Sequence, residues 1–330
     1  MPEKSASSGA SAPLTIDGSL AGRRLDAALG ELLPGLGVRA RRRLIEGGGL
    51  LLNGRRVRAP GLTVRRGDVL RLVESPVAAV ASAPWSYPAQ QPRVLRDDAP
   101  YLFLFKPAGL HTVALGGGSA PSLESLLPAL LPAPPRLLQR LDFETSGLIC
   151  ATSSAEGGEV FRTAEARNEV CKGYLALLQG SLETPVTARA AIAMDGGATV
   201  RIRAGEEEDA GRWTSFVPLV RWRASETAAV AEALGMPVPD GPLTLAACRI
   251  GRGARHQIRA HAAWLGLPLW GDARYGGSGT HFFLHHGRFH MASVECRCLP
   301  PWLAALAGLP GDAPEAARRW LEAPVPAVGP

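Results

Sequence analysis

Hydrophobic residues recur with two different periods along this chain, and the change of period divides it into regions. Near the N-terminus, Leu25, Leu29, Leu32 and Leu33 follow the spacing of one helix face. A second helix is predicted over residues 38–46, and the run of glycines that follows it is a typical helix end. The pattern therefore predicts two short helices at the start of the folded chain.

Short apolar runs after these helices predict strands. Residues 50–57 contain an Asn-Gly pair between apolar segments, which indicates a hairpin, and residues 69–72 predict a further strand. Later in the chain, strands are predicted at 101–105, 148–151, 172–178, 243–250 and 282–284, with helices at 122–131 and 257–265. This order predicts a mixed α+β fold with a largely antiparallel sheet, preceded by a small α/β unit.

Composition divides the 330 residues into segments. Residues 1–14 are rich in Ser, Ala, Gly and Pro, and we expect them to be disordered. A small domain is predicted over 15–75. The Ala- and Pro-rich segment 76–92 is expected to be a linker, and a larger domain is expected over 93–325.

The positive charge of the chain is concentrated in the small domain. The whole chain has a net charge of +6, and 33 of its 36 cationic residues are arginine. Residues 15–75 hold twelve arginines against six acidic residues, so this segment carries as much net charge as the whole chain. The second predicted helix carries Arg39, Arg41, Arg42 and Arg43. We expect these four arginines to bind a nucleic-acid phosphate backbone; the alternative is a solvated helix face.

Several classes of protein are disfavoured by composition. The five cysteines are an odd number and form no Cys-x-x-Cys pair, so neither a disulfide framework nor a zinc ribbon is indicated. No apolar run approaches the ~20 residues that a membrane span needs, and residues 1–13 lack the apolar core of a signal peptide. We therefore expect a cytoplasmic protein without a membrane segment, and folding arguments favour a monomer.

One short stretch is the strongest candidate for chemistry. Arg140 and Asp142 precede a Thr-Ser-Gly breaker at 145–147 and an apolar run that begins at Leu148. A turn that leads into a strand would hold Asp142 at a rigid edge, where a nearby cation keeps a carboxylate ionised as a nucleophile or base. The alternative is an aspartate that only bonds its own turn.

Four segments together resemble the RluA-type pseudouridine synthases. These are the Lys-Pro-x-Gly turn in 101–110, the Arg-Leu-Asp and Thr-Ser-Gly-Leu segment in 140–148, the Lys-x-Tyr strand in 172–177 and the His-Gln-Ile-Arg segment in 255–276. Four motifs in the right order are far more specific than one, and the resemblance covers about residues 16 to 300. The arginine-rich N-terminal unit resembles an RNA-binding module that is shared with a ribosomal small-subunit protein.

The resemblance implies that uridine in RNA is isomerised to pseudouridine without a cofactor or a metal, in the domain at 93–325. It implies that Asp142 is the catalytic carboxylate, that Arg259 pairs with it, and that Tyr174 stacks on the target base. It also implies that substrate is bound by Arg140, Ile258, His256 and Gln257. The implied partner is RNA, most commonly that of the large ribosomal subunit and in some cases transfer RNA.

Departures from the family pattern leave an alternative open. Gln139 and Phe143 replace the usual His and Arg around Arg-Leu-Asp, and Ala254 and Arg255 replace residues before His-Gln. We therefore expect the chemistry to be kept and the RNA contacts to differ; the alternative is a non-catalytic RNA-binding or ribosome-assembly protein on the same fold.

Two other features have less weight. A metal hydrolase would use the histidines at 281, 285, 286 and 290, but no acid or cysteine pair accompanies them. Asp272, close to Tyr275, is expected to be structural, in a turn.

Overall fold

The computed structural model describes residues 13–32, 38–46, 50–57, 59–72, 91–114, 121–193, 199–279 and 281–325. The chain forms two compact units: Met1–Trp85 with Ala114–Ala120, and Ser86–Val113 with Pro121–Pro330. The disordered segment expected at 1–14 and the linker expected at 76–92 lie almost entirely outside the described residues.

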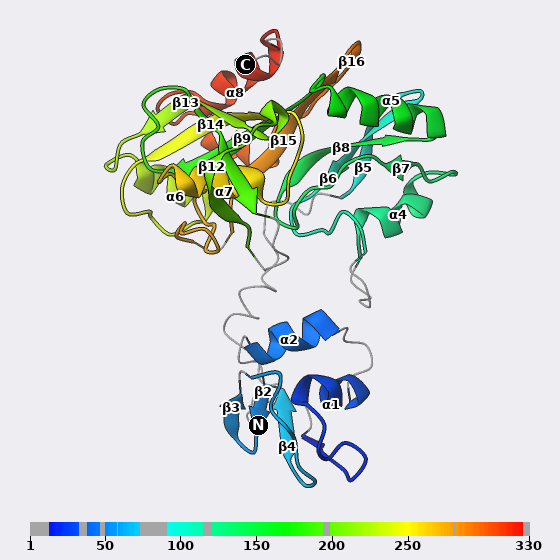
Figure 1. Ribbon diagram of the computed structural model, residues 1–330. Coiled ribbons are helices and arrows are strands. Elements are labelled where there is room, and N and C mark those ends of the chain that lie inside the picture. The colour runs from blue at the N-terminus through cyan, green and yellow to red at the C-terminus, as the bar shows by residue number, and fades with distance from the viewer. Residues whose placement is uncertain are drawn as a thin grey trace, which may run out of the picture. The chain divides into compact units, whose positions relative to one another are not determined.

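The first unit has the two helices and the hairpin that the sequence predicts (Figure 1). Its four-stranded antiparallel sheet has the order β1-β4-β2-β3. The hairpin turn is made by Asn53 and Gly54, both with positive φ. The elements are β1 (Leu14–Thr15), α1 (Leu25–Leu32), α2 (Val38–Glu46), β2 (Leu50–Leu52), β3 (Arg55–Val57) and β4 (Val69–Leu72).

The second unit is built on a ten-stranded sheet, with the order β10-β13-β14-β9-β15-β8-β6-β5; β16 pairs with β15 and β7 with β8. In this sheet, β15 and β8 form the one parallel pair among the described strands. The expected mixed α+β fold with a mainly antiparallel sheet is confirmed. The strands of this sheet are β5 (Arg93–Asp98), β6 (Tyr101–Lys106), β7 (Arg136–Leu137), β8 (Ser146–Thr152), β9 (Val170–Gln179), β10 (Val186–Ala188), β13 (Thr214–Trp222), β14 (Leu243–Ile250), β15 (Leu284–Met291) and β16 (Val294–Arg297).

Helices and a two-stranded sheet complete the second unit. In it, α5 packs on β8 and β9, α8 packs on β13 and β14, and α7 packs on β12 and β13 (Figure 1). These elements are α4 (Leu123–Leu130), α5 (Ala155–Ala166), β11 (Ala190–Ala193), β12 (Arg201–Glu206), α6 (Thr227–Leu234), α7 (Gln257–Trp264) and α8 (Ala313–Glu322), with 3-10 helices η1 (Ala210–Arg212) and η2 (Pro301–Leu306).

The strand predicted at 282–284 is wrong in its bounds, because β15 begins at Leu284 and continues to Met291. Its apolar pattern stops at two histidines, yet His285 and His286 are completely buried. Ser146 and the carbonyl of Cys298 bond both ring nitrogens of His285, and the carbonyl of Leu148 bonds Nδ1 of His286, so polar residues continue a core strand here.

The parallel pairing fixes the start of β8. His285 and His286 pair with Ser146 and Gly147. Gly147 has φ +115°, and a Cβ at this position would overlap the backbone of His286, so only glycine fits. The expected Thr-Ser-Gly turn is therefore corrected, because Ser146 and Gly147 already belong to β8. The pairing of these two residues with β15 fixes the end of the loop that precedes β8.

Candidate active site

Asp142 lies in the loop just before β8, as the sequence predicts. The Thr112 hydroxyl donates to the carbonyl of Leu141 (2.9 Å) and accepts from its N–H (3.0 Å). On the other side of Asp142, the carbonyl of Phe143 accepts from Lys106 Nζ at 3.2 Å. The backbone is thus fixed on both sides of the carboxylate, whose side chain remains 24% exposed.

Lys106 is a buried cation that sequence reasoning passed over. Its ammonium donates to the carbonyls of Pro107 (2.8 Å) and Leu110 (2.7 Å) as well as Phe143. Burial lowers the pKa of Lys106 to about 7, and the negative charge of Asp142 opposes that decrease. The lysine of the predicted Lys-Pro-x-Gly turn therefore supports the loop that carries Asp142.

Arg259, on α7, joins two carboxylates. Its Nη1 donates to Asp142 Oδ2 at 3.2 Å. Its Nε and Nη2 donate to the two oxygens of Asp272 at 2.6 and 2.8 Å, which is a bidentate pair. Asp272 was expected in a turn, and it does lie in one, but its carboxylate also orients the guanidinium. The signal was available in the sequence, because Asp272 lies in the 255–276 segment that resembles the pseudouridine synthases.

Aromatic rings surround the same guanidinium. Its central carbon lies 4.4 Å from the ring centroid of Phe282 and 5.0 Å from that of Tyr275, within range of cation–π attraction. Burial opposes the charge of Arg259, but the hydrogen bonds and charge of Asp272 outweigh burial and raise its pKa. Arg259 is therefore a fixed cation rather than the surface helix residue that its position would otherwise indicate.

Tyr174, on β9, stacks on His286 with ring centroids 4.6 Å apart and planes 20° apart. Burial, and next the charge of Asp142, raise the pKa of the Tyr174 phenol, so this residue keeps its proton at neutral pH. The neighbouring His286 donates from Nδ1 to the carbonyl of Leu148 at 2.6 Å. The tyrosine ring is held from behind by a buried, neutral imidazole.

A cavity of about 500 Å³ brings the candidate residues together. Its wall combines an ionic side, an aromatic residue and apolar side chains, which suits a flat polar base. All seven residues that the resemblance points to for catalysis and substrate binding line it: Arg140, Asp142, Tyr174, His256, Gln257, Ile258 and Arg259.

His256 precedes α7 with φ +55°, an uncommon conformation for a residue with a side chain. The Tyr275 hydroxyl accepts from the N–H of Val200 (2.9 Å), so its own proton is directed to His256 Nδ1 (2.9 Å). This pattern assigns the proton of the neutral ring to Nε2, which lies 3.8 Å from Asp142 Oδ2. Burial lowers the pKa of His256 to about 4, so the ring is neutral near pH 7.

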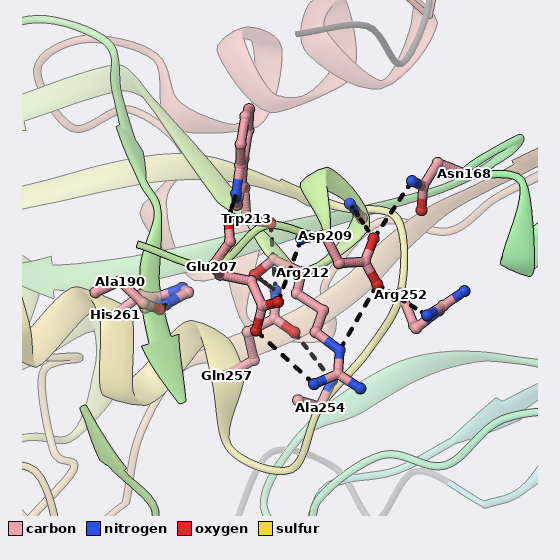
Figure 2. Close-up of polar contacts among 11 residues, drawn as sticks. Asn168, Ala190, Glu207, Asp209, Arg212, Trp213, Arg252, Ala254, Gln257 and His261 are labelled. Carbon is pink, nitrogen blue, oxygen red and sulfur yellow. Dashed lines mark hydrogen bonds and ion pairs between the residues drawn. The ribbon is translucent and has the colours of Figure 1, made fainter. Parts of the chain in front are cut away.

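Gln257 contacts the protein rather than open space. Its Nε2 donates to the carbonyl of Arg212 at 2.8 Å, its Oε1 accepts from the N–H of Ala254 at 2.9 Å, and the side chain is buried (Figure 2). These bonds brace the start of α7, and the substrate contact expected of Gln257 stays a prediction. His261, one helical turn further along, is also buried. Its Nε2 donates to the carbonyl of Ala190, and its Nδ1 is hydrogen-bonded to the Thr214 hydroxyl.

Asp209 fixes the loop that leads to His256, and sequence reasoning missed it. Its carboxylate accepts from Arg252 Nη1 at 2.8 Å and from Asn168 at 3.3 Å (Figure 2). Arg212 lies between Asp209 and Glu207 at 3.7 and 3.8 Å. No motif marks these residues, because the contacts join segments far apart in the chain.

The described residues contain no group of three or more His, Cys, Asp or Glu side chains that could hold a metal ion. Two of the histidines considered for a metal hydrolase make hydrogen bonds within the protein. Both ring nitrogens of His285 bond Ser146 and the carbonyl of Cys298, and Nδ1 of His286 bonds the carbonyl of Leu148. Within the same described ranges, no helix is long and apolar enough to cross a membrane.

Comparison with known proteins identifies the family. Residues 100–264 match the RNA pseudouridylate synthase family, and residues 23–70 match the S4 domain. The chain is 30% identical over 277 residues to a protein of Xylella fastidiosa named ribosomal large subunit pseudouridine synthase D, covering 82% of this chain and 76% of that one. A protein of the same name from Xanthomonas campestris is 31% identical over 270 residues, covering 79% and 73%.

The chain belongs to the RNA pseudouridylate synthase family.

A solved structure agrees with this fold. Human RNA pseudouridylate synthase domain containing 1 is similar with a TM-score of 0.53 and 21% identity, over 72% of this chain and 97% of that one. The family assignment makes the loop of Asp142 and the start of α7 parts of a synthase domain, and makes the first unit an S4 domain.

Two of the four arginines expected to bind phosphate also have partners within the S4 domain. Arg42 Nε donates to Asp26 at 2.9 Å and joins α2 to α1. Arg41 packs on Gly30 of α1, where a Cβ would overlap its guanidinium. These two side chains therefore contact the domain itself. The side chains of Arg39 and Arg43 lie outside the described part of the chain.

Proposed function

We propose that this protein isomerises a uridine of large-subunit ribosomal RNA to pseudouridine, with Asp142 as the catalytic carboxylate. The single supporting observation is the partly exposed Asp142 in the cavity, paired with Arg259, which Asp272 orients in turn. The names of the two bacterial relatives support ribosomal RNA over transfer RNA. The same proposal places its action in the compartment that holds ribosomal RNA, which we take to be the cytoplasm.

The reaction is an intramolecular transfer. The bond between N1 of uracil and C1′ of ribose breaks, the base turns, and C5 forms a bond to C1′ while N1 gains a proton and C5 loses one. In this proposal Asp142 acts on the sugar or the base. Arg259 and His256 both approach Oδ2, so Oδ1 is the carboxylate oxygen without a hydrogen bond in the described residues and serves as the reactive atom.

The other cavity residues position the base. The protonated Tyr174 offers a flat face backed by His286, and Ile258 offers an apolar wall. A base in folded RNA leaves its stack to enter such a site, and an aromatic surface recovers part of the lost stacking. Gln257 acts as a positioning residue, because its amide braces the segment that carries Ile258 and Arg259.

RNA is held in part by the S4 domain. With Arg42 bound to Asp26, we assign phosphate contacts to the exposed arginines at 55, 65, 66 and 71 and to Arg39 and Arg43 of α2. We also keep the protein as a monomer in this proposal.

The test uses total RNA from a strain that lacks the gene. The purified protein is added, and pseudouridine is mapped by chemical labelling at single-nucleotide resolution. We expect one or a few new sites with the wild-type protein, none with Asp142→Ala or Asp142→Asn, and RNA affinity within about 3-fold of wild type for both variants, because neither contacts phosphate.

Asp97→Ala is the matched control, because it removes an exposed carboxylate of β5 and should leave the map unchanged. A map without new sites for the wild-type protein, combined with tight RNA binding, would instead favour the non-catalytic RNA-binding protein.

A further inference from the structure

An aromatic side chain stands exposed beside the candidate catalytic carboxylate. Phe143 directly follows Asp142 and is 44% exposed, which makes it one of the few large apolar residues on the surface of the second unit. Its ring lies 4.6 Å from that of His111, with a 41° angle between the planes. Exposure alone is common for single apolar residues; what sets Phe143 apart is that it directly follows Asp142, which lines the cavity.

The backbone under this ring is firmly held. The carbonyl of Phe143 accepts from the N–H of Gly109 at 2.9 Å and from Lys106 at 3.2 Å. The Thr112 hydroxyl joins the loop of His111 to the loop of Asp142 through its two hydrogen bonds with Leu141. The two rings are therefore carried by loops that are bonded to each other, so they form one preformed surface rather than two mobile side chains.

Charge indicates which partner fits this surface. On the other side of Asp142 in the same loop, Arg140 is exposed and lines the cavity. A cation and an aromatic ring that flank a base-binding cavity match a nucleic-acid strand, whose phosphates attract the arginine and whose bases stack on the ring.

We propose that Phe143, supported by His111, is a stacking platform for the nucleobase next to the target uridine. This inference rests on the proposed function, since it takes the cavity at Asp142 as the uridine site. Stacking on a phenyl ring does not depend on base identity, because every base has a π face. The platform would thus hold the flanking nucleotide out of its own helix while the uridine enters the cavity.

The test uses the full-length protein and two single-stranded RNA heptamers. Each has one central uridine and one 2-aminopurine, either 5′ or 3′ of that uridine, with cytidine elsewhere. The fluorescence of 2-aminopurine falls when the base stacks. We expect wild-type protein and Phe143→Tyr to quench one of the two probes. Phe143→Leu, which keeps an apolar side chain without a π face, should not quench it and should bind about 10-fold more weakly.

An abasic nucleotide in place of the 2-aminopurine gives the matched control. With this RNA, wild-type protein and Phe143→Leu should bind equally, because the base that distinguishes them is absent. Val160→Ala, which trims another exposed apolar residue, should behave as wild type with every probe.

Two outcomes overturn the platform: equal quenching by wild type and Phe143→Leu, or no quenching of either probe by the wild-type protein. Quenching is independent of turnover. A platform that quenches in a protein with no mapped pseudouridine would leave the stacking site standing and remove the proposed function. A mapped pseudouridine without quenching would support the proposed function and rule out the stacking platform.

Discussion

The two units of this protein use the same pair of residues in different surroundings. In the S4 domain, Arg42 meets Asp26 at 2.9 Å with the arginine side chain 52% exposed. In the synthase domain, Arg259 meets Asp272 at 2.6 Å, and the two side chains are 5% and 1% exposed. The Asp26 side chain is only 7% exposed, so water reaches the first pair from the arginine side, whereas both partners of the second pair are buried, with Arg259 at the cavity wall.

This difference shows what burial does to an ion pair. A pair with an exposed cation adds little, since the arginine is solvated when the pair breaks and Arg24 also binds the Asp26 carboxylate. A buried guanidinium that joins two carboxylates is different, because its removal leaves the Asp272 carboxylate where water does not reach it. The Arg42–Asp26 pair joins α2 to α1, whereas the Arg259–Asp272 pair orients the guanidinium that bonds Asp142.

The largest expected effect comes from Arg259→Met. This variant leaves the buried Asp272 without its cationic partner, with the N–H of Arg274 at 3.3 Å as a remaining donor. We expect the free energy of unfolding to fall by about 3–5 kcal/mol and activity to be lost. Urea unfolding followed by tryptophan fluorescence measures the first quantity, and pseudouridine mapping measures the second.

Arg259→Lys separates charge from geometry, since an ammonium lacks the planar fork that holds Asp272 and Asp142 together. It should recover part of the stability and little of the activity. Full activity in the lysine variant would contradict the role of the fork.

The next largest effect is expected from acidic pH, which should lower the stability of the synthase domain. All seven histidines follow residue 110, so the S4 domain has none in its segment 15–75. Burial lowers the pKa of His285 to about 3 and that of His286 to about 4, below the ordinary 6.5. The unfolded chain therefore binds more protons than the folded chain below about pH 6.5, and stability is lost as pH falls.

Two such groups give a slope of up to about 2.7 kcal/mol per pH unit. Urea unfolding at pH 7.5, 6.5 and 5.5 should show a loss of less than about 1 kcal/mol between the first two values and of about 2 kcal/mol between the last two. Equal stability at all three would mean that these histidines are protonated in the folded protein.

Arg42→Gln should cost less. It removes an exposed charge but keeps a hydrogen-bonding side chain near Asp26, and Arg24 also donates to that carboxylate at 3.2 Å. We expect the free energy of unfolding to fall by about 1 kcal/mol or less. Hydrogen exchange of the amides of α1 and α2 would locate the change, and a loss as large as that of Arg259→Met would erase the contrast between the two pairs.

The smallest effect is expected from Arg65→Ala and Arg66→Ala, which are exposed and carry the phosphate contacts in our proposal. Each should leave stability unchanged and reduce the slope of log affinity against log salt by about 0.7–0.9. Arg223→Ala removes the same charge from an exposed position of the synthase domain. Identical slopes for all three variants and wild type would show that residues 65 and 66 do not contact phosphate.

Local patterns predicted most of the secondary structure that matters. The helices at 25–33, 38–46 and 257–265 and the strands near 101, 148, 172 and 243 are present with small shifts of their ends. These segments have one apolar face or a continuous apolar run, and such patterns depend on nearby residues alone. The predicted β15 was too short because His285 and His286 are polar in sequence, although each bonds a distant carbonyl and is buried.

The sequence predicted which residues form the candidate site, but not the contacts that hold them in place. Motif order pointed to Asp142, Tyr174 and Arg259, and all three line one cavity. The bidentate Asp272, the buried Lys106 and the brace of Gln257 were not predicted in these roles, because each depends on partners that no spacing rule brings together. The bond of Arg42 to Asp26 was not predicted for the same reason, since a charged residue in a helix does not reveal its partner.

Neighbouring residues were enough to predict the α+β class, the concentration of arginine in the small domain and the family motifs, because propensity, charge and motif order are local properties. Which arginine is exposed and which is fixed between two carboxylates depends on how the chain packs. The reason is physical: the strength of an ion pair depends on the water around it, and burial arises when segments distant in sequence pack together.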